Sequence, residues 1–90
     1  MKIEFDPAKR QATLHYRGLD MARALEIFAG ATLTIGDGRK DYGEPRFITI
    51  GSLDGRMVVS VWTPRGAVRR IISLRKANDR EKALYGSRLD

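Results

Sequence analysis

The spacing of hydrophobic residues predicts two helices in the first third of the chain. Residues 5–20 (FDPAKRQATLHYRGLD) begin with Asp6, a favourable N-cap, and Pro7, which suits the first helical position. Gly18 suits a left-handed C-cap. A second helix is predicted over residues 20–30, where a core-facing stripe recurs at helical spacing. That stripe consists of Met21, Ala24, Leu25 and Phe28.

After residue 30 the pattern changes to short β-branched and apolar runs separated by turns. Asp54 and Gly55 form a strong hairpin signal, and the polar, glycine-rich segment 36–45 is typical of a loop. The expected strands are residues 31–35, 46–51, 57–63 and 67–75, with a short additional strand at 2–5. Tight turns between consecutive strands indicate an antiparallel meander.

The C-terminal segment 78–86 (NDREKALYG) predicts a third helix. Asn78 is its expected N-cap, and Glu81 is placed to complete a capping box. We therefore expect one α+β domain over residues 1–90. It should contain a small antiparallel sheet, two N-terminal helices and one C-terminal helix, with the helices mainly on one face.

Composition argues against several classes of function. The chain has no cysteine and a single histidine, His15, so cysteine-based and His-rich metal sites are not expected. We predict neither a metal nor a cofactor. No apolar run reaches the ~18–20 residues that span a bilayer, and the first ten residues are too polar for a signal peptide. A cytoplasmic protein without a membrane partner is expected.

The net charge of +6 is concentrated in one part of the chain. Residues 65–88 hold eight Lys or Arg and two acidic residues, whereas the rest holds nine of each sign. Such a patch attracts polyanions, including RNA, DNA and acidic proteins. The alternative is a solvated basic face without a partner.

The predicted strand 67–75 (AVRRIISLR) carries several of these charges. Regular alternation assigns Val68, Arg70, Ile72 and Leu74 to one face, and Arg69, Ile71, Ser73 and Arg75 to the other. The first face is mostly apolar, whereas the second is half polar and open to solvent or a ligand. Arginines on a rigid strand are preorganised to bind phosphate bidentately. The alternative is that they are ordinary exposed strand positions.

Arginine, glutamate and tyrosine side chains brought together could cleave RNA without a metal. A base takes the proton of the attacking 2′-hydroxyl, cations stabilise the phosphorane, and an acid protonates the 5′ oxygen. Glu81 and Tyr85 share one face of the last predicted helix, beside the arginines of the preceding strand.

Three stretches resemble the BrnT family, the toxins of BrnT–BrnA type II toxin–antitoxin systems: FDPAK (5–9), GEPRFITIG (43–51) and RIISLRKANDREKALY (70–85). The resemblance implies a RelE-like fold and a bacterial cytoplasmic toxin that cleaves RNA and blocks translation. It also implies a cognate BrnA-like antitoxin, which neutralises the toxin and gives the complex its DNA binding.

One segment departs from the family pattern Asn-Leu-x-Lys-His-Gly. Here the chain reads TLHYRG, so that Thr13 replaces Asn, Tyr16 replaces Lys and Arg17 replaces His. Arg17 cannot act as a general base, because arginine keeps its proton. His15 lies two positions earlier, about 200° around the helix, and is a poor substitute.

We therefore predict an endoribonuclease toxin in which Glu44 or Glu81 is the base and Tyr85 the proton donor. The cations assigned to phosphate binding or transition-state stabilisation are Lys9, Arg46, Arg70 and Arg75, and further RNA contacts are assigned to Arg69, Lys76 and Arg80. Two alternatives use the same basic patch. One is a non-catalytic nucleic-acid-binding module, and the other is a module whose groove only seats an acidic antitoxin tail.

Overall fold

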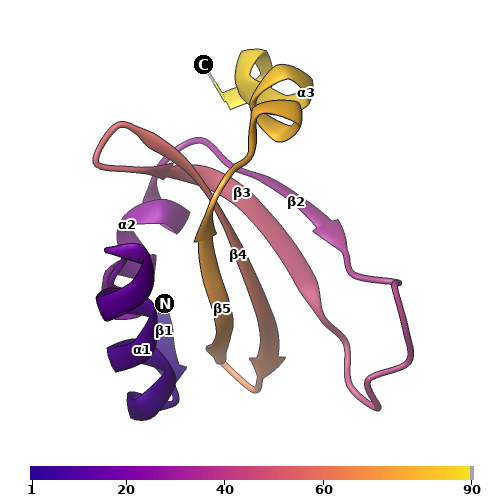
Figure 1. Cartoon of the computed structure of the whole chain (residues 1–90). Coiled ribbons are helices and arrows are strands. Elements are labelled where there is room, and N and C mark those ends of the chain that lie inside the picture. The colour runs from indigo at the N-terminus through magenta and orange to yellow at the C-terminus, as the bar shows by residue number, and fades with distance from the viewer. Residues whose placement is uncertain (90) are drawn as a thin grey trace.

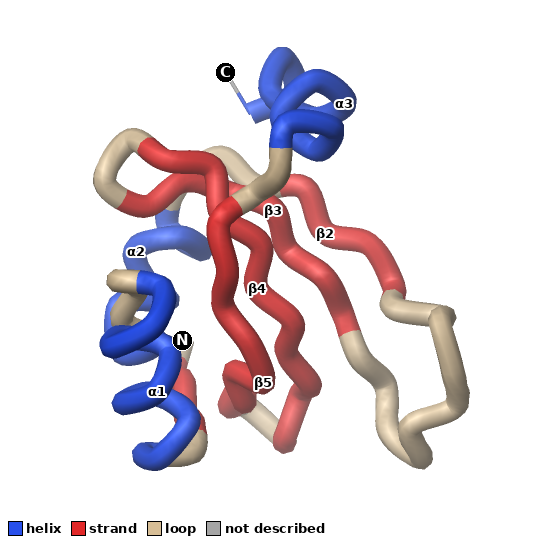
Figure 2. The backbone as a smooth tube through the Cα atoms, viewed as in Figure 1, coloured by secondary structure: helices blue, strands red, loops and turns tan. Residues whose placement is uncertain are grey.

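The computed structural model describes residues 1–89 (Figures 1 and 2). The elements follow the order β1 (Lys2–Phe5), α1 (Pro7–Arg17), the 3-10 helix η1 (Met21–Arg23), α2 (Ala24–Ala29), β2 (Leu33–Gly36), β3 (Phe47–Leu53), β4 (Arg56–Arg65), β5 (Val68–Lys76) and α3 (Asp79–Leu89). The predicted α+β class is confirmed, with two N-terminal helical segments and one C-terminal helix.

The five strands form one sheet in the order β1-β5-β4-β3-β2. Strands β2 to β5 make the predicted antiparallel meander, whereas β1 joins the edge of β5 in parallel, so the sheet is mixed. The β3–β4 turn has Asp54 at φ 53° and Gly55 at φ 74°. Two successive left-handed residues match the right-handed twist of the paired strands.

The N-terminal helices form for the expected local reasons, with one change. The Asp6 side chain accepts a 2.8 Å hydrogen bond from the Ala8 N–H, and Gly18 is left-handed with φ 68°. The second predicted helix is divided into η1 and α2. A 3-10 turn advances by 120° per residue, so it rotates the helical face that follows. Leu25 is therefore 41% exposed, and Ile27, which the predicted stripe omitted, is fully buried.

Hydrophobic residues gather on both faces of the sheet. The larger core contains Met21, Ile27, Trp62 and Leu74 and is covered by η1 and α2. On the opposite face, Tyr85 and Leu89 of α3 pack against a smaller cluster formed by Ile50, Val59 and Ala77. Figure 1 shows α3 over one end of this second face and α1 beside its edge. The rest of that face is left open between the two helices.

A β-bulge in β5 changes which arginines share a face. Val61 pairs with Ser73 and Trp62 pairs with Ile71, so that Ile72 has no partner across the ladder. The predicted regular alternation of residues 67–75 is therefore wrong. Ile71 and Leu74 both lie in the larger core, which places Arg69 on that face and sends Arg70 and Arg75 to the α3 face.

Candidate functional site

A cavity of about 190 Å³ lies at the end of the sheet where β3 begins and β4 ends. It brings together four of the predicted site residues, namely Lys9, Glu44, Arg46 and Arg70, and its remaining lining residues are Asp6, Arg65, Ile71 and Ile72. Arg65 was not predicted as a site residue. Its place as the first basic residue of the segment 65–88 is the sequence signal that could have identified it.

Glu44 is the carboxylate best placed for chemistry in this cavity. Its Oε1 lies 3.7 Å from Nη2 of Arg65, and its Oε2 lies 3.9 Å from Nε of Arg46. These are ion-pair distances beyond hydrogen-bonding range, and the side chain is 31% exposed. By contrast, the other cavity acid, Asp6, is already engaged as the N-cap of α1. The lone pairs of Glu44 are therefore available to accept a proton.

The guanidinium of Arg46 lies against an aromatic ring. It stacks over the ring of Tyr42, 3.9 Å from the ring centroid, while Lys40 approaches the same ring at 5.0 Å. Arg46 Nε is buried and has no hydrogen-bond partner among residues 1–89. A buried donor without a partner is costly, so a phosphate oxygen entering the cavity would satisfy it. Tyr42 lies in a loop, where no hydrophobic periodicity identifies it as a contact of Arg46.

The loop that carries Glu44 is fixed at both ends. Asp37 is buried, accepts two hydrogen bonds from the Arg39 guanidinium (both 2.8 Å), and its N–H donates to the Arg46 carbonyl (2.8 Å). The Arg39 hydrogen bonds lower the pKa of Asp37 to about 2. At the other end, the Thr63 hydroxyl donates to the Pro45 carbonyl at 2.6 Å. These contacts hold Glu44 and Arg46 over the cavity.

The other predicted catalytic residues lie at the opposite end of the same face. Arg75 donates two hydrogen bonds to Glu81, at 2.7 and 2.8 Å, and Glu81 also accepts the Asn78 N–H at 2.9 Å. The latter bond confirms the predicted capping box, because Asn78 Oδ1 accepts the Glu81 N–H in return. Tyr85 packs on the smaller core. The structure therefore does not bring Arg75, Glu81 and Tyr85 into the Glu44 cavity.

The Arg75–Glu81 ion pair makes Glu81 the weaker of the two candidate bases. The Arg75 guanidinium, acting first through its hydrogen bonds, lowers the pKa of Glu81 to about 2. A carboxylate with this pKa and three hydrogen bonds is a weak proton acceptor near neutral pH. Glu44 is the better candidate.

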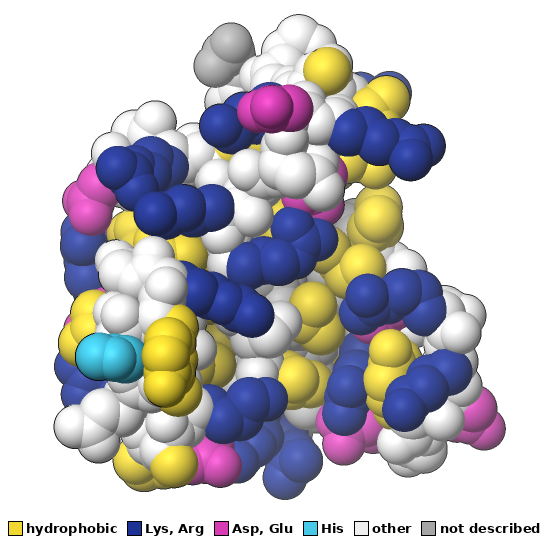
Figure 3. All heavy atoms as spheres, viewed as in Figure 1, with side chains coloured by type: hydrophobic (Ala, Val, Ile, Leu, Met, Phe, Trp, Pro, Cys, Tyr) yellow, Lys and Arg dark blue, Asp and Glu magenta, His cyan; other side chains and the backbone are white. Residues whose placement is uncertain are grey.

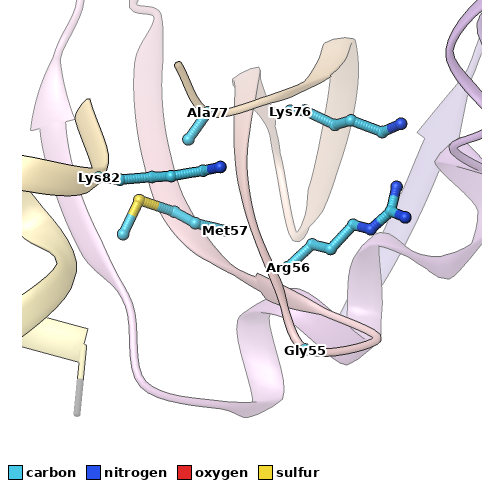
Figure 4. A pocket seen from close by; sticks show the side chains of 6 residues that line it. All are labelled: Gly55, Arg56, Met57, Lys76, Ala77 and Lys82. Atoms are coloured by element: carbon cyan, nitrogen blue, oxygen red, sulfur yellow. The ribbon is translucent and has the colours of Figure 1, made fainter. Parts of the chain in front are cut away.

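The three residues predicted to contact RNA occupy different places. Arg69 stacks over Trp62 at 4.2 Å and over Phe28 at 4.6 Å, on the face covered by η1 and α2. Lys76 and Arg80 are exposed. Lys76 also borders a second cavity, of about 370 Å³, between α3 and the β3–β4 hairpin. Figure 4 shows Arg56 and Lys76 pointing toward the same side of this cavity, which Lys82 enters from α3.

The open part of the sheet is strongly basic. Figure 3 shows Lys and Arg side chains gathered between α1 and α3, and again over the loop after β2. Among residues 1–89, Lys9, Arg17 and Lys76 have no carboxylate within ion-pairing distance, whereas Arg70 lies 3.5 Å from Glu4. No three His, Asp or Glu side chains in this part of the chain are grouped as metal ligands. No helix within it is long and apolar enough to cross a membrane.

The fold and the cavity together describe a small α+β domain with a cation-lined site around one available carboxylate. A family model described as "Ribonuclease toxin, BrnT, of type II toxin-antitoxin system" matches residues 5–81. The chain therefore belongs to the BrnT family of ribonuclease toxins, as its resemblance predicted. A family of this type implies an RNA target and a cognate antitoxin. A search of curated proteins found no match.

The Arg75–Glu81 pair should make part of the stability depend on pH. The pKa of Glu81 in the folded protein is about 2, below its ordinary value of 4.5. The stabilisation from the ion pair is therefore present above pH 4.5 and is lost as the pH falls toward 2. Glu81→Gln keeps a capping-box residue but removes the charge. We expect it to lower the free energy of unfolding by about 1–2 kcal/mol at pH 7, reduced from the full shift because Arg75 is partly exposed.

Urea unfolding of both proteins at pH 7 and pH 2 measures this difference. The difference should shrink to about 0.4 kcal/mol or less at pH 2, where about half of the Glu81 carboxylates in the folded wild type are protonated. An equal loss of stability at both pH values would mean that packing or capping, and not the ion pair, accounts for the effect.

Proposed function

We propose that the chain is a metal-independent endoribonuclease and that the Glu44 cavity is where it cleaves RNA. The observation that carries the proposal is the position of Glu44, which has no hydrogen bond from residues 1–89 and shares a cavity with Lys9, Arg46, Arg65 and Arg70. Four cations around one proton acceptor match the charge that develops when a 2′-hydroxyl attacks phosphorus.

Each step of the proposed reaction has a side chain assigned to it. Glu44 takes the proton of the 2′-hydroxyl as its oxygen bonds to phosphorus. Arg46 and Arg70 stabilise the phosphorane charge, and the unpartnered Nε of Arg46 donates to one of its oxygens. The bond from phosphorus to the 5′ oxygen then breaks, and the Lys9 ammonium protonates that oxygen. The products are a 2′,3′-cyclic phosphate and a free 5′-hydroxyl.

Lys9 replaces Tyr85 as the proposed proton donor. Tyr85 packs on the smaller core under α3, whereas Lys9 lines the same cavity as Glu44. An arginine could not take this role, because its guanidinium does not release a proton under these conditions. A lysine ammonium can exchange its proton with a reacting oxygen.

The cellular consequences are part of the same proposal. RNA cleavage by a toxin of this kind would stop translation in the cytoplasm. A BrnA-like antitoxin would neutralise it, and DNA would be bound only by the toxin–antitoxin complex. Induced expression in a bacterium, followed by growth and bulk protein synthesis, tests the toxic effect. Co-expression of a cognate BrnA-like antitoxin should restore growth.

Removal of metal tests the proposed chemistry. We expect purified protein to cleave labelled RNA equally well with and without EDTA, because side-chain cations supply the charge stabilisation. End analysis should find 2′,3′-cyclic phosphate or 3′-phosphate at the new 3′ ends. Cleavage that is lost in EDTA and restored by magnesium would contradict the mechanism, and intact RNA that stays bound would favour a non-catalytic binding module.

A further inference from the structure

The segment that departs from the family pattern lines a groove between α1 and β5. Lys9, Thr13, Tyr16 and Arg17 lie at helical spacing on one side of α1. A hollow of about 490 Å³ runs between them and Ser73 of β5. It continues into a second hollow, of about 370 Å³, that Tyr16 and Arg17 share with Arg75. Through Lys9 and Ile72, the first hollow also adjoins the Glu44 cavity. One groove therefore leads from the proposed cleavage site along the length of α1.

The groove carries positive charge that no acid neutralises over most of its length. Among residues 1–89, Lys9 and Arg17 make no ion pair, and Arg17 is oriented by a 2.9 Å hydrogen bond from its Nη1 to the Leu74 carbonyl. That bond leaves the other guanidinium donors of Arg17 free for a ligand. Arg75 is the exception, because its guanidinium is held by Glu81. The charges at the two ends of the groove suit a polyanion that runs along α1.

Tyr16 adds an aromatic surface to this track. Its side chain is 82% exposed, the highest value among the exposed large hydrophobic residues, and packing does not explain it. Its one aromatic contact within residues 1–89 is an edge-to-face contact with the neighbouring His15, with centroids 4.6 Å apart. An exposed ring beside a basic groove is the arrangement on which single-stranded nucleic acids stack their bases. A duplex keeps its bases stacked internally and offers no base to this ring.

The length of the groove sets the size of its ligand. Lys9 and Arg17 are eight residues apart in the helix, which corresponds to about 12 Å along its axis. At a stacked rise of about 3.4 Å per nucleotide, this length accommodates roughly three or four nucleotides. A single phosphate would leave most of the groove empty.

We propose that the α1–β5 groove binds the single strand of RNA that flanks the cleavage site, with a base stacked on Tyr16 and phosphates held by Lys9 and Arg17. The inference deepens the proposed function, on which it rests, because it assigns the substrate class to single-stranded RNA. It also gives a role to Tyr16 and Arg17: they bind the substrate at positions where the family pattern has other residues.

Equilibrium binding of a fluorescent 2′-O-methyl oligoribonucleotide tests the groove apart from catalysis. This probe cannot be cleaved, because its attacking hydroxyl is blocked, and a length of about eight nucleotides covers the groove. Tyr16→Ala should weaken binding roughly 5- to 150-fold, the loss expected for one base–aromatic stack. Tyr16→Phe should bind within about twofold of wild type, because it keeps the ring. Leu14→Ala is the matched control, and it should bind like wild type, since Leu14 is an exposed apolar residue of α1 that does not line the groove.

Charge is tested separately through salt dependence. Arg17→Gln should reduce the magnitude of the log–log salt slope by about 0.7, the value for one phosphate contact with a single strand. Arg88→Gln, an exposed arginine on α3, lines neither hollow and should leave the slope unchanged. A duplex of the same sequence should bind wild type and Tyr16→Ala equally.

Three results would overturn the groove proposal. These are wild-type affinity in Tyr16→Ala, equal losses in the Phe and Ala variants, or a Tyr16→Ala defect limited to an acidic peptide, which would assign the groove to a protein partner. The failure of the catalytic proposal looks different. If Glu44→Gln cleaved RNA normally, the proposed mechanism would be wrong. The binding results would still show whether the α1–β5 groove binds single-stranded RNA.

Discussion

Glu44→Gln should lower kcat/KM for RNA cleavage by about 100- to 10,000-fold, the usual contribution of a positioned general base. The amide keeps the size of the side chain but cannot accept the proton of the 2′-hydroxyl. Glu44 receives no hydrogen bond from residues 1–89 and is partly exposed, so the fold should tolerate the change. Cleavage of a labelled RNA under single-turnover conditions measures the effect, and urea unfolding verifies that the variant is folded.

Glu81→Gln is the matched control for this prediction. It makes the same chemical change at the acid that Arg75 and Asn78 already bind. We expect a loss of stability at neutral pH but little change in the rate of cleavage by the folded protein. If Glu81→Gln were the inactive variant and Glu44→Gln the active one, the base would lie at the α3 end of the face, and the reaction would have to be assigned to that end.

Trp62→Ala should destabilise the domain by about 3–5 kcal/mol, the range for removing a large aromatic side chain from a core. Trp62 stacks with Phe47 at a centroid distance of 5.0 Å and meets the edge of Phe28 at 6.0 Å. Its indole N–H donates to Thr49 at 2.8 Å, and Arg69 lies over its ring. The change therefore removes packing, a buried hydrogen bond and a cation–π contact together. Chemical denaturation measures the loss.

Trp62→Phe separates these contributions, because it keeps an aromatic ring under Arg69 but loses the hydrogen bond. It should cost clearly less than the alanine variant. A typical domain has only about 5–15 kcal/mol of stability, so Trp62→Ala should also lose RNA cleavage through partial unfolding. A Trp62→Ala variant that is as stable as Trp62→Phe would show that the ring contributes little to the core.

Most of the fold follows from local sequence signals. The Asp6 cap, the Asp54-Gly55 turn and the Asn78–Glu81 capping box each form as predicted, because each depends on residues close together in the chain. The parallel pairing of β1 with β5 does not follow in this way. It joins residues more than sixty positions apart, and no local pattern encodes that choice.

The candidate site could be predicted in part, from residue type. Residue type singled out Lys9, Glu44, Arg46 and Arg70 as candidates, and the structure groups these four around one cavity. The choice between Glu44 and Glu81 could not be made, because it depends on which acid an arginine has already bound. The role of Tyr42 depends on how the 36–45 loop folds back on β3, which periodicity does not reveal.

The bulged residue Ile72 in β5 determines which face of the sheet carries the arginines of this strand. Their distribution depends on the number of residues between them, and not on composition alone. Arg70 and Arg75 are five positions apart, an odd separation that a regular strand would divide between its two sides. Because Ile72 is bulged out of the β4–β5 ladder, side-chain alternation shifts by one position across it, and both arginines face the same side of the sheet. Deleting this one neutral residue would leave the net charge and the order of the basic residues unchanged, yet it would split the basic surface in two. Single-residue insertions and deletions in this strand are therefore a route by which relatives could gain or lose a continuous basic surface while every arginine is kept.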